Sequence, residues 1–219
     1  MNNKLALALA TVAAVSVAPV MAESSIEAKV GAEMWWPNTK VNEVRRDNDN
    51  TPSVYASIEH SFAYIPDVRF RYSSVDSDYM AFDKYDLTFY YRVLEHDLMH
   101  FDAGVTVSDL ANTQYINAHT EQSATFDEVI WAWYGYAELT VPNTNFDIIG
   151  EMNFGDSSGI KSTDLIAGIQ YRLPLKNSQI AFRGGYRAID LESETFREPE
   201  LGKPFIFADG WFLGAEFSF

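Results

Sequence analysis

The sequence repeats one local pattern, a stretch of roughly ten residues in which apolar and polar side chains alternate. In residues 26–36, for example, Ile26 and Val30 lie on one face of an extended strand, and Glu27 and Lys29 lie on the other. A period of two indicates a β-strand whose two faces meet different surroundings. Ten such strands are predicted, at 26–36, 53–62, 67–76, 82–93, 100–109, 128–141, 145–154, 163–173, 179–189 and 206–219.

The connections between these strands alternate in length. Four are short, at 63–66, 94–99, 142–144 and 174–178, and the others are mostly longer, at 37–52, 77–81, 110–127, 155–162 and 190–205. Short periplasmic turns that alternate with longer external loops are typical of outer-membrane barrels, whose tilted strands span the bilayer in about ten residues. We therefore predict an all-β fold, a single ten-stranded antiparallel transmembrane β-barrel over residues 23–219. The alternative is a soluble sandwich or lipocalin-like barrel, which turns its apolar faces inward.

The N-terminal segment predicts export. Residues 1–22 combine Lys4, an apolar run from Leu5 to Val20 and a small residue at Ala22, which is the layout of a secretory signal peptide. The apolar run is shorter than the ~20 residues of a membrane-spanning helix. The chain contains no cysteine, so neither a disulfide nor a lipid anchor is expected. Its net charge of −15 argues against nucleic-acid binding, and the predicted location is the cell outer membrane.

Aromatic residues are expected to form two rims on such a barrel, because amphipathic rings favour the membrane–water interface. The predicted external rim consists of Trp35, Trp36, Trp131, Trp133 and Trp211. The predicted periplasmic rim consists of Phe62, Tyr64, Phe101, Tyr171, Phe217 and Phe219.

The polar face of each strand is expected to line the lumen. By parity, the charged residues on that face are Glu27, Lys29, Glu33, Glu59, Arg69, Arg71, Lys84, Asp86, Arg92, Asp102, Glu138, Asp147, Glu151, Arg172, Arg183, Arg187 and Glu216. Acids and bases are nearly balanced, whereas a wide selective pore usually has an excess of one sign. We therefore predict a lumen largely filled by ion pairs. Lys29 is expected opposite Glu216 where the first and last strands meet. Glu59 is expected to face Arg69 or Arg71.

Two short motifs carry a resemblance to known proteins. The last strand ends in Phe217 and Phe219, which resembles the C-terminal signal read by the barrel assembly machinery of Gram-negative outer membranes. The ninth strand contains Gly184-Gly185. With the ten-strand layout, this pair resembles a functionally uncharacterised family of small Gram-negative outer-membrane barrels that a Gly-Gly pair marks. The resemblance covers the whole mature chain and implies a location and a fold, but no activity. Curvature of the barrel wall is the favoured reason for the pair, over close approach of a ligand.

No catalytic cluster is predicted. His60, His96 and His100 fall at the periplasmic end, and His119 stands alone in the 110–127 connection. No metal site or cofactor is expected, apart from a divalent cation held by acidic loops such as 190–205, since hard cations take carboxylate oxygens. The expected partners are outer-membrane lipids and lipopolysaccharide, and the barrel is expected to be a monomer that binds no nucleic acid.

Three functions follow from this reading of the sequence. The first is a structural or surface-interaction protein with acidic external loops and no catalysis. The alternative is a narrow cation-preferring channel for small solutes, whose acidic entrance would concentrate cations. The third is a lipid-modifying or proteolytic outer-membrane enzyme, which the scattered histidines support least.

Overall fold

The structure is a computed structural model, which describes residues 26–41, 44–47, 50–62, 64–77, 80–116, 121–193 and 206–219. The predicted signal peptide, residues 1–22, lies outside these ranges. The strands are β1 (Ile26–Val41), β2 (Val44–Asp47), β3 (Thr51–His60), β4 (Asp67–Asp76), β5 (Met80–His96), β6 (Met99–Ile116), β7 (Ser123–Ala124), β8 (Glu128–Thr140), β9 (Phe146–Ser157), β10 (Ile160–Pro174), β11 (Gln179–Ser193) and β12 (Ile206–Ser218). Within the described ranges, no helix is long and apolar enough to cross a bilayer.

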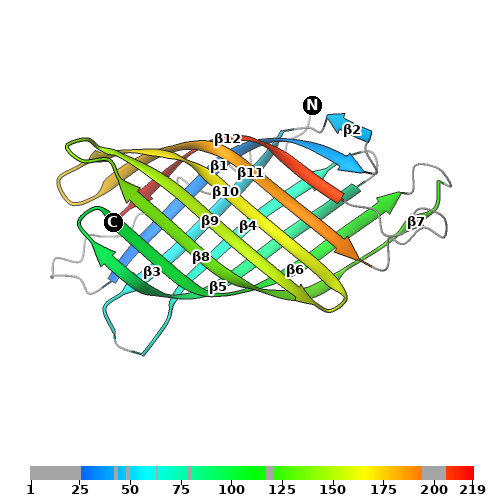
Figure 1. Ribbon diagram of the computed structural model, residues 1–219, viewed down its shortest axis with the longest axis horizontal. Coiled ribbons are helices and arrows are strands. Elements are labelled where there is room, and N and C mark those ends of the chain that lie inside the picture. The colour runs from blue at the N-terminus through cyan, green and yellow to red at the C-terminus, as the bar shows by residue number, and fades with distance from the viewer. Residues whose placement is uncertain are drawn as a thin grey trace.

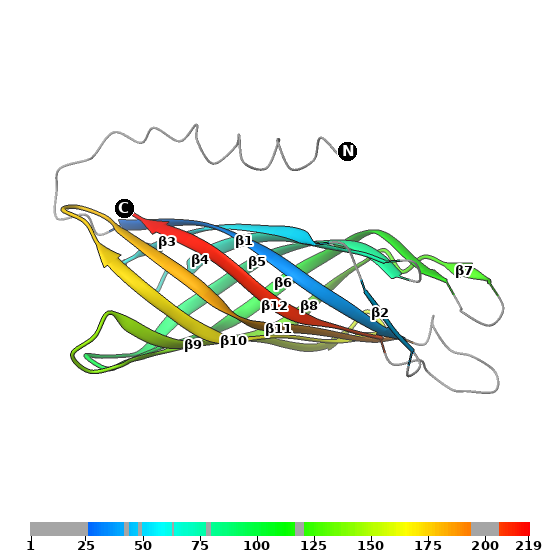
Figure 2. The same ribbon diagram turned by 90° about the horizontal axis from the view of Figure 1, so that it is seen from above.

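The strands form a closed antiparallel barrel (Figures 1 and 2). β1, β3, β4, β5, β6 and β8 to β12 pair in sequence, and β12 pairs with β1 to complete the ring. Short β2 pairs with the end of β1, and β7 pairs with the end of β6. At the seam, the backbone N–H groups of Ala28 and Phe219 each donate to the other residue's carbonyl, both at 2.9 Å. The predicted ten-stranded all-β barrel is confirmed.

The register at the seam differs from the predicted one by two residues. Lys29 lies opposite Ser218 and Gly31 lies opposite Glu216, so the expected pair of Lys29 with Glu216 is wrong. Because side chains alternate with a period of two, a two-residue shift leaves every residue on its predicted face. The assignment of faces therefore survives although the pairing does not.

Polarity is reversed relative to a soluble barrel. Charged side chains are buried inside, Asp147 with 0 % and Arg187 with 1 % of their surface exposed. The outer face exposes a belt of large apolar side chains, among them Phe70, Leu87, Phe89, Val107, Ile148, Phe154, Leu165, Ile169, Phe182 and Leu213. An apolar exterior around a polar interior is the arrangement of an outer-membrane barrel.

The two ends of the barrel differ. The end that holds Ile26 and Phe219 carries the short turns, and we refer to it as the periplasmic end. At the other end the hairpins extend further than predicted: β1 continues to Val41, β6 continues to Ile116, and β9 and β10 are joined by Ser158-Gly159 alone (Figure 2). Beyond the apolar belt the outward side chains become polar, so the alternation that marked each strand in the sequence fades while the ladder of backbone hydrogen bonds continues.

Candidate functional site

All seventeen charged residues that were predicted to line the lumen lie on the interior side. Eleven are buried there: Glu33, Glu59, Arg69, Arg71, Lys84, Asp86, Asp102, Asp147, Glu151, Arg183 and Arg187. Six line a cavity at the periplasmic mouth: Glu27, Lys29, Arg92, Glu138, Arg172 and Glu216. Along the barrel, the interior side chains form three layers: ionic clusters in the middle, an apolar layer at the external end and a polar cavity at the periplasmic mouth.

The middle layer contains an ion-pair plug centred on Glu151 of β9. Arg71 Nη1 lies 2.7 Å from Glu151 Oε1, and Arg69 Nη1 lies 2.8 Å from Glu151 Oε2. Both arginines come from β4, so these contacts cross the lumen rather than link neighbouring strands. The expected contact of Glu59 with either arginine is therefore wrong. Glu59 instead binds Lys29 Nζ at 2.7 Å and Arg92 Nη2 at 2.9 Å.

A tyrosine forms the platform for this plug. The guanidinium carbons of Arg69, Arg71 and Arg183 lie 4.4, 5.3 and 5.4 Å from the centroid of the Tyr55 ring, within the range of cation–π attraction. The Tyr55 hydroxyl donates to Glu216 Oε2 at 2.8 Å and accepts from Arg183 Nη1. Directly across the β1–β3 pair, a Cβ on Gly31 would lie 2.1 Å from the Tyr55 ring. Gly31 thus makes room for the ring that organises three arginines.

A second ionic cluster lies around Asp164 of β10. Arg187 donates to both carboxylate oxygens, with Nε at 2.9 Å from Oδ1 and Nη2 at 2.7 Å from Oδ2. Lys84 Nζ bridges Asp164, at 3.0 Å, and Asp86, at 2.6 Å. Asp164 was absent from the residues predicted for the lumen. Its parity with Arg172 on the same strand would have identified it.

The external part of the lumen is filled by apolar side chains. This outer plug consists of buried Trp35, Val75, Met80, Phe82, Leu110, Tyr115, Phe126, Ile130, Ile160, Ile166, Ile189, Leu191, Ile206, Ala208 and Phe212. Phe126 comes from the segment before β8, and its ring meets Phe82 edge-on at 6.3 Å. Its backbone N–H donates to Thr113 Oγ1 at 2.6 Å, which holds the residue in place. A close-packed layer of apolar side chains at this level opposes the passage of water and ions.

The predicted place of Trp35 in the exposed external rim is wrong. It is 1 % exposed and belongs to the outer plug, where the Arg187 guanidinium lies 5.1 Å from its ring and its Nε1–H donates to the Gly210 carbonyl at 3.2 Å. Trp35 and Trp36 are consecutive in β1, so their side chains must point to opposite faces. The exposed tryptophans are Trp36, Trp131, Trp133 and Trp211.

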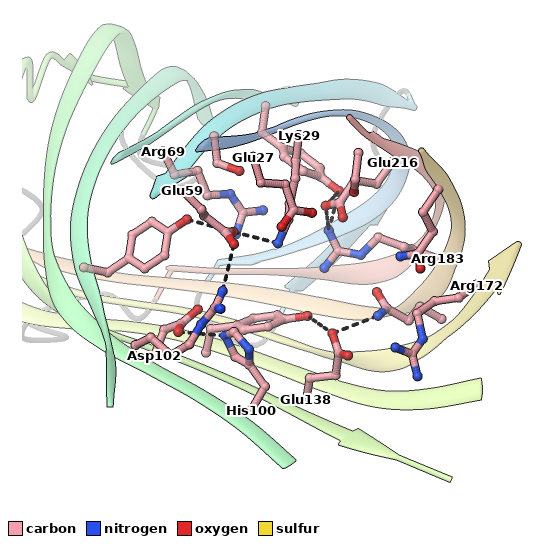
Figure 3. A pocket seen from close by; sticks show the side chains of 18 of the residues that line it. Glu27, Lys29, Glu59, Arg69, His100, Asp102, Glu138, Arg172, Arg183 and Glu216 are labelled. Carbon is pink, nitrogen blue, oxygen red and sulfur yellow. Dashed lines mark hydrogen bonds and ion pairs between the residues drawn. The ribbon is translucent and has the colours of Figure 1, made fainter. Parts of the chain in front are cut away.

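The layer at the periplasmic mouth is a cavity of about 230 Å³ (Figure 3). Its rim includes the strand ends at Glu27, Glu95, Gln179 and Ser218, and Arg183 is among the residues that line it. Its walls are polar side chains and tyrosine rings, and the Tyr90 and Tyr134 rings contact each other in a tilted arrangement with their centroids 5.6 Å apart. The cavity therefore differs from the apolar outer plug in both composition and access.

The histidines in the described part of the chain lie beside carboxylates or backbone groups at the periplasmic end. His100 lies between Asp102, at 2.7 Å from Nε2, and Glu95, at 3.2 Å from Nδ1. His60 Nδ1 lies 3.7 Å from Asp67, and His96 Nδ1 accepts the backbone N–H of Leu98. His119 falls outside the described ranges. Over those ranges, no group of three or more histidine, aspartate or glutamate side chains is arranged to hold a metal ion.

Comparison with known proteins gives structural neighbours only. No family model matches the chain, and no curated protein matches it in sequence. Among solved structures, the outer membrane protease OmpT from Escherichia coli is 9 % identical with a TM-score of 0.45, over 93 % of this chain and 99 % of that one. The β domain of the Bordetella autotransporter BrkA is 12 % identical with a TM-score of 0.46, over 88 % and 98 %. The KdgM porin is 11 % identical with a TM-score of 0.36, over 85 % and 99 %. Similarities at this level establish no activity.

Proposed function

We propose that the protein is a non-conducting barrel of the outer membrane that acts as a structural and surface-interaction protein. The filled lumen is the observation that carries this proposal. Buried ion pairs occupy its middle and apolar side chains occupy its external part, all of them on strands or on the segment that leads into β8. A narrow channel would require a connected polar path, and the outer plug interrupts it.

The external surface supports an interaction with lipopolysaccharide. Between the belt of large apolar side chains and the external ends of the strands, the outward faces carry the carboxylates of Asp76, Asp83, Asp109, Asp156 and Asp190. These groups lie at the level of the anionic headgroups that surround such a barrel, so contact between the two would need a bridging divalent cation. The acidic residues Glu194, Glu198 and Glu200 of the predicted loop lie outside the described ranges.

We infer further that the chain is a monomer without catalytic activity or a resident cofactor, and that it belongs to the barrel family marked by a Gly-Gly pair. The position of His60 and His100 at the periplasmic end, away from the external loops, supports the absence of catalysis. The Gly184-Gly185 motif and the ten-strand layout support the family.

Planar-bilayer recording of the refolded mature protein tests the proposal. We expect no discrete openings under conditions in which a known porin conducts. A variant that lacks residues 194–205 should also be silent, because the filling comes from the wall strands and the segment before β8. Reproducible openings of the full chain would refute the proposal, and cation selectivity would favour the channel instead.

A further inference from the structure

Two carboxylates that line the periplasmic cavity have no cation beside them. Glu138 Oε2 accepts hydrogen bonds from the Tyr136 hydroxyl at 3.1 Å and from Gln170 Nε2 at 2.9 Å, which are both neutral donors. Glu27, at the mouth, lies opposite another carboxylate, Glu59, in the register of β1 with β3. Neither Glu138 nor Glu27 forms an ion pair with a residue of the described ranges. Both negative charges are therefore available to a cationic ligand.

The basic side chains of the lining are already neutralised. Lys29 and Arg92 both bind Glu59, at 2.7 and 2.9 Å, and Arg172 binds Asp147 at 2.7 Å. The remaining pairs are Arg69 with Glu151, Arg183 with Glu33 and Glu216, and His100 with Glu95 and Asp102. With the acids behind the lining included, carboxylates outnumber cations around the cavity, so its field attracts positive charge.

Two buried hydroxyl groups face the same space without partners. Ser57 of β3 and Ser218 of β12 line the cavity, each with only 6 % of its surface exposed. Among the described residues neither side chain has a hydrogen-bond partner, and neither hydroxyl oxygen is sealed off from the cavity. They flank Lys29, whose charge Glu59 compensates, because both lie opposite it in the strand register. Since a hydroxyl oxygen has two acceptor lone pairs, these groups suit a ligand that donates hydrogen bonds.

The two free carboxylates lie on opposite walls. Their strands, β1 and β8, are five places apart in the ring of ten, the largest separation that the ring allows. Figure 3 shows Glu27 and Glu138 on opposite sides of the cavity. One metal ion needs several oxygen ligands within about 2.6 Å, so it cannot serve both walls. Two ammonium groups on one flexible chain can, and the volume of about 230 Å³ leaves room for a short linker between them.

We propose that this cavity binds a short aliphatic diamine, which enters from the periplasmic end. One ammonium group binds Glu138. The other binds at the mouth, where Glu27 supplies the negative charge and the hydroxyl oxygens of Ser57 and Ser218 accept N–H bonds. Binding needs no conducting lumen, because the cavity lies below the outer plug. Failure of the silent-barrel proposal in the bilayer experiment would therefore leave this site untouched.

Titration of the ¹⁵N-labelled mature protein in detergent micelles, at constant ionic strength, tests the site. 1,4-Diaminobutane should cause saturable shifts in the amide resonances of strand residues around the cavity. n-Butylamine keeps one of the two charges and should bind about tenfold more weakly, the loss expected for one charge-assisted hydrogen bond. 1,4-Butanediol, of similar length but uncharged, should cause no shift, and Mg²⁺ should not displace the diamine.

Three variants locate the ligand. Glu138→Gln and Glu27→Gln each remove one charge with little change of shape, and each should weaken diamine binding about tenfold. Ser57→Ala removes one hydroxyl acceptor and should weaken binding about fivefold. Asp97→Asn is the matched control, because it removes a carboxylate from the exposed turn between β5 and β6, at the same end but outside the cavity lining. Its affinity for the diamine should be unchanged.

Four results would each overturn the assignment: equal binding of the diamine and n-butylamine, displacement of the diamine by Mg²⁺, equal losses in Asp97→Asn and Glu138→Gln, or no saturable shift. Heat-modifiable gel mobility shows whether each variant is folded. The ligand series on the unaltered protein decides the question even where a variant does not fold.

Discussion

Single side chains inside this barrel depend on partners from distant strands. Glu151 is 5 % exposed and neutralises both Arg69 and Arg71, which are about eighty residues away in the chain. Because a buried ion pair is costly to desolvate, it stabilises a fold only while both charges remain present. The plug is therefore sensitive to the loss of one member.

Glu151→Gln should lower the free energy of unfolding by about 3–5 kcal/mol, since it leaves two buried guanidiniums without a counter-charge. Urea titration in detergent, followed by tryptophan fluorescence, measures this loss. Glu95→Gln is the matched control: its side chain is 59 % exposed, and exposed pairs contribute at most about 1 kcal/mol. Equal losses in the two variants would contradict the plug.

A single hydroxyl also lowers the pKa of an external carboxylate. The Thr113 hydroxyl and backbone N–H donate to Asp127 Oδ1 at 2.6 and 2.9 Å, and these bonds lower the pKa of Asp127 below its ordinary 3.8. A lowered pKa in the folded state stabilises the fold above the ordinary value, and this contribution is lost as the pH falls through the folded-state pKa. Thr113→Val should raise the pKa of Asp127 toward its ordinary value, as measured by the carboxyl ¹³C shift against pH. An unchanged titration would show that the hydroxyl plays no part.

At the scale of the strands, glycines allow close approach of neighbours. Gly168 of β10 lies opposite Gly185 of β11, and a Cβ on Gly185 would lie 2.2 Å from the Ala167 carbonyl oxygen. Since backbone cannot move aside as a flexible side chain can, this position excludes any larger residue. The contact gives Gly185 a steric role in the wall, and curvature as the reason for the Gly184-Gly185 pair stays a prediction.

Gly185→Ala should destabilise the barrel by about 1–3 kcal/mol, the usual penalty of overpacking. Gly135→Ala serves as the control, because a Cβ there meets nothing within 4 Å, and its effect should stay within about 0.5 kcal/mol. Urea midpoints of the two variants provide the comparison. A larger loss for Gly135→Ala would show that strand propensity, not close approach, governs these positions.

At the scale of the whole molecule, the inverted polarity separates tryptophans by environment. Trp133 and Trp211 are 61 % and 68 % exposed on the outer face, whereas Trp35 is enclosed in the lumen. In vesicles of brominated lipid, variants that retain only Trp133 or only Trp211 should be strongly quenched, and one that retains only Trp35 should not. Quenching of Trp35 as strong as that of Trp133 would mean that the barrel is not inverted in the bilayer.

The alternation of side chains by itself determined the ten strands of the wall and the face on which each charged residue lies, because a period of two is a local property of extended backbone. Together with the alternating lengths of the connections, it predicted the antiparallel barrel. Contacts across the lumen could not be found in this way. Arg69 and Arg71 meet Glu151 rather than Glu59, because barrel shear decides which strands face each other across the interior. Lys29 meets Glu59 of the neighbouring β3 rather than Glu216, because the register at the seam differs from the predicted one by two residues. Those global quantities also placed Trp35 in the outer plug and left a polar cavity at the periplasmic mouth.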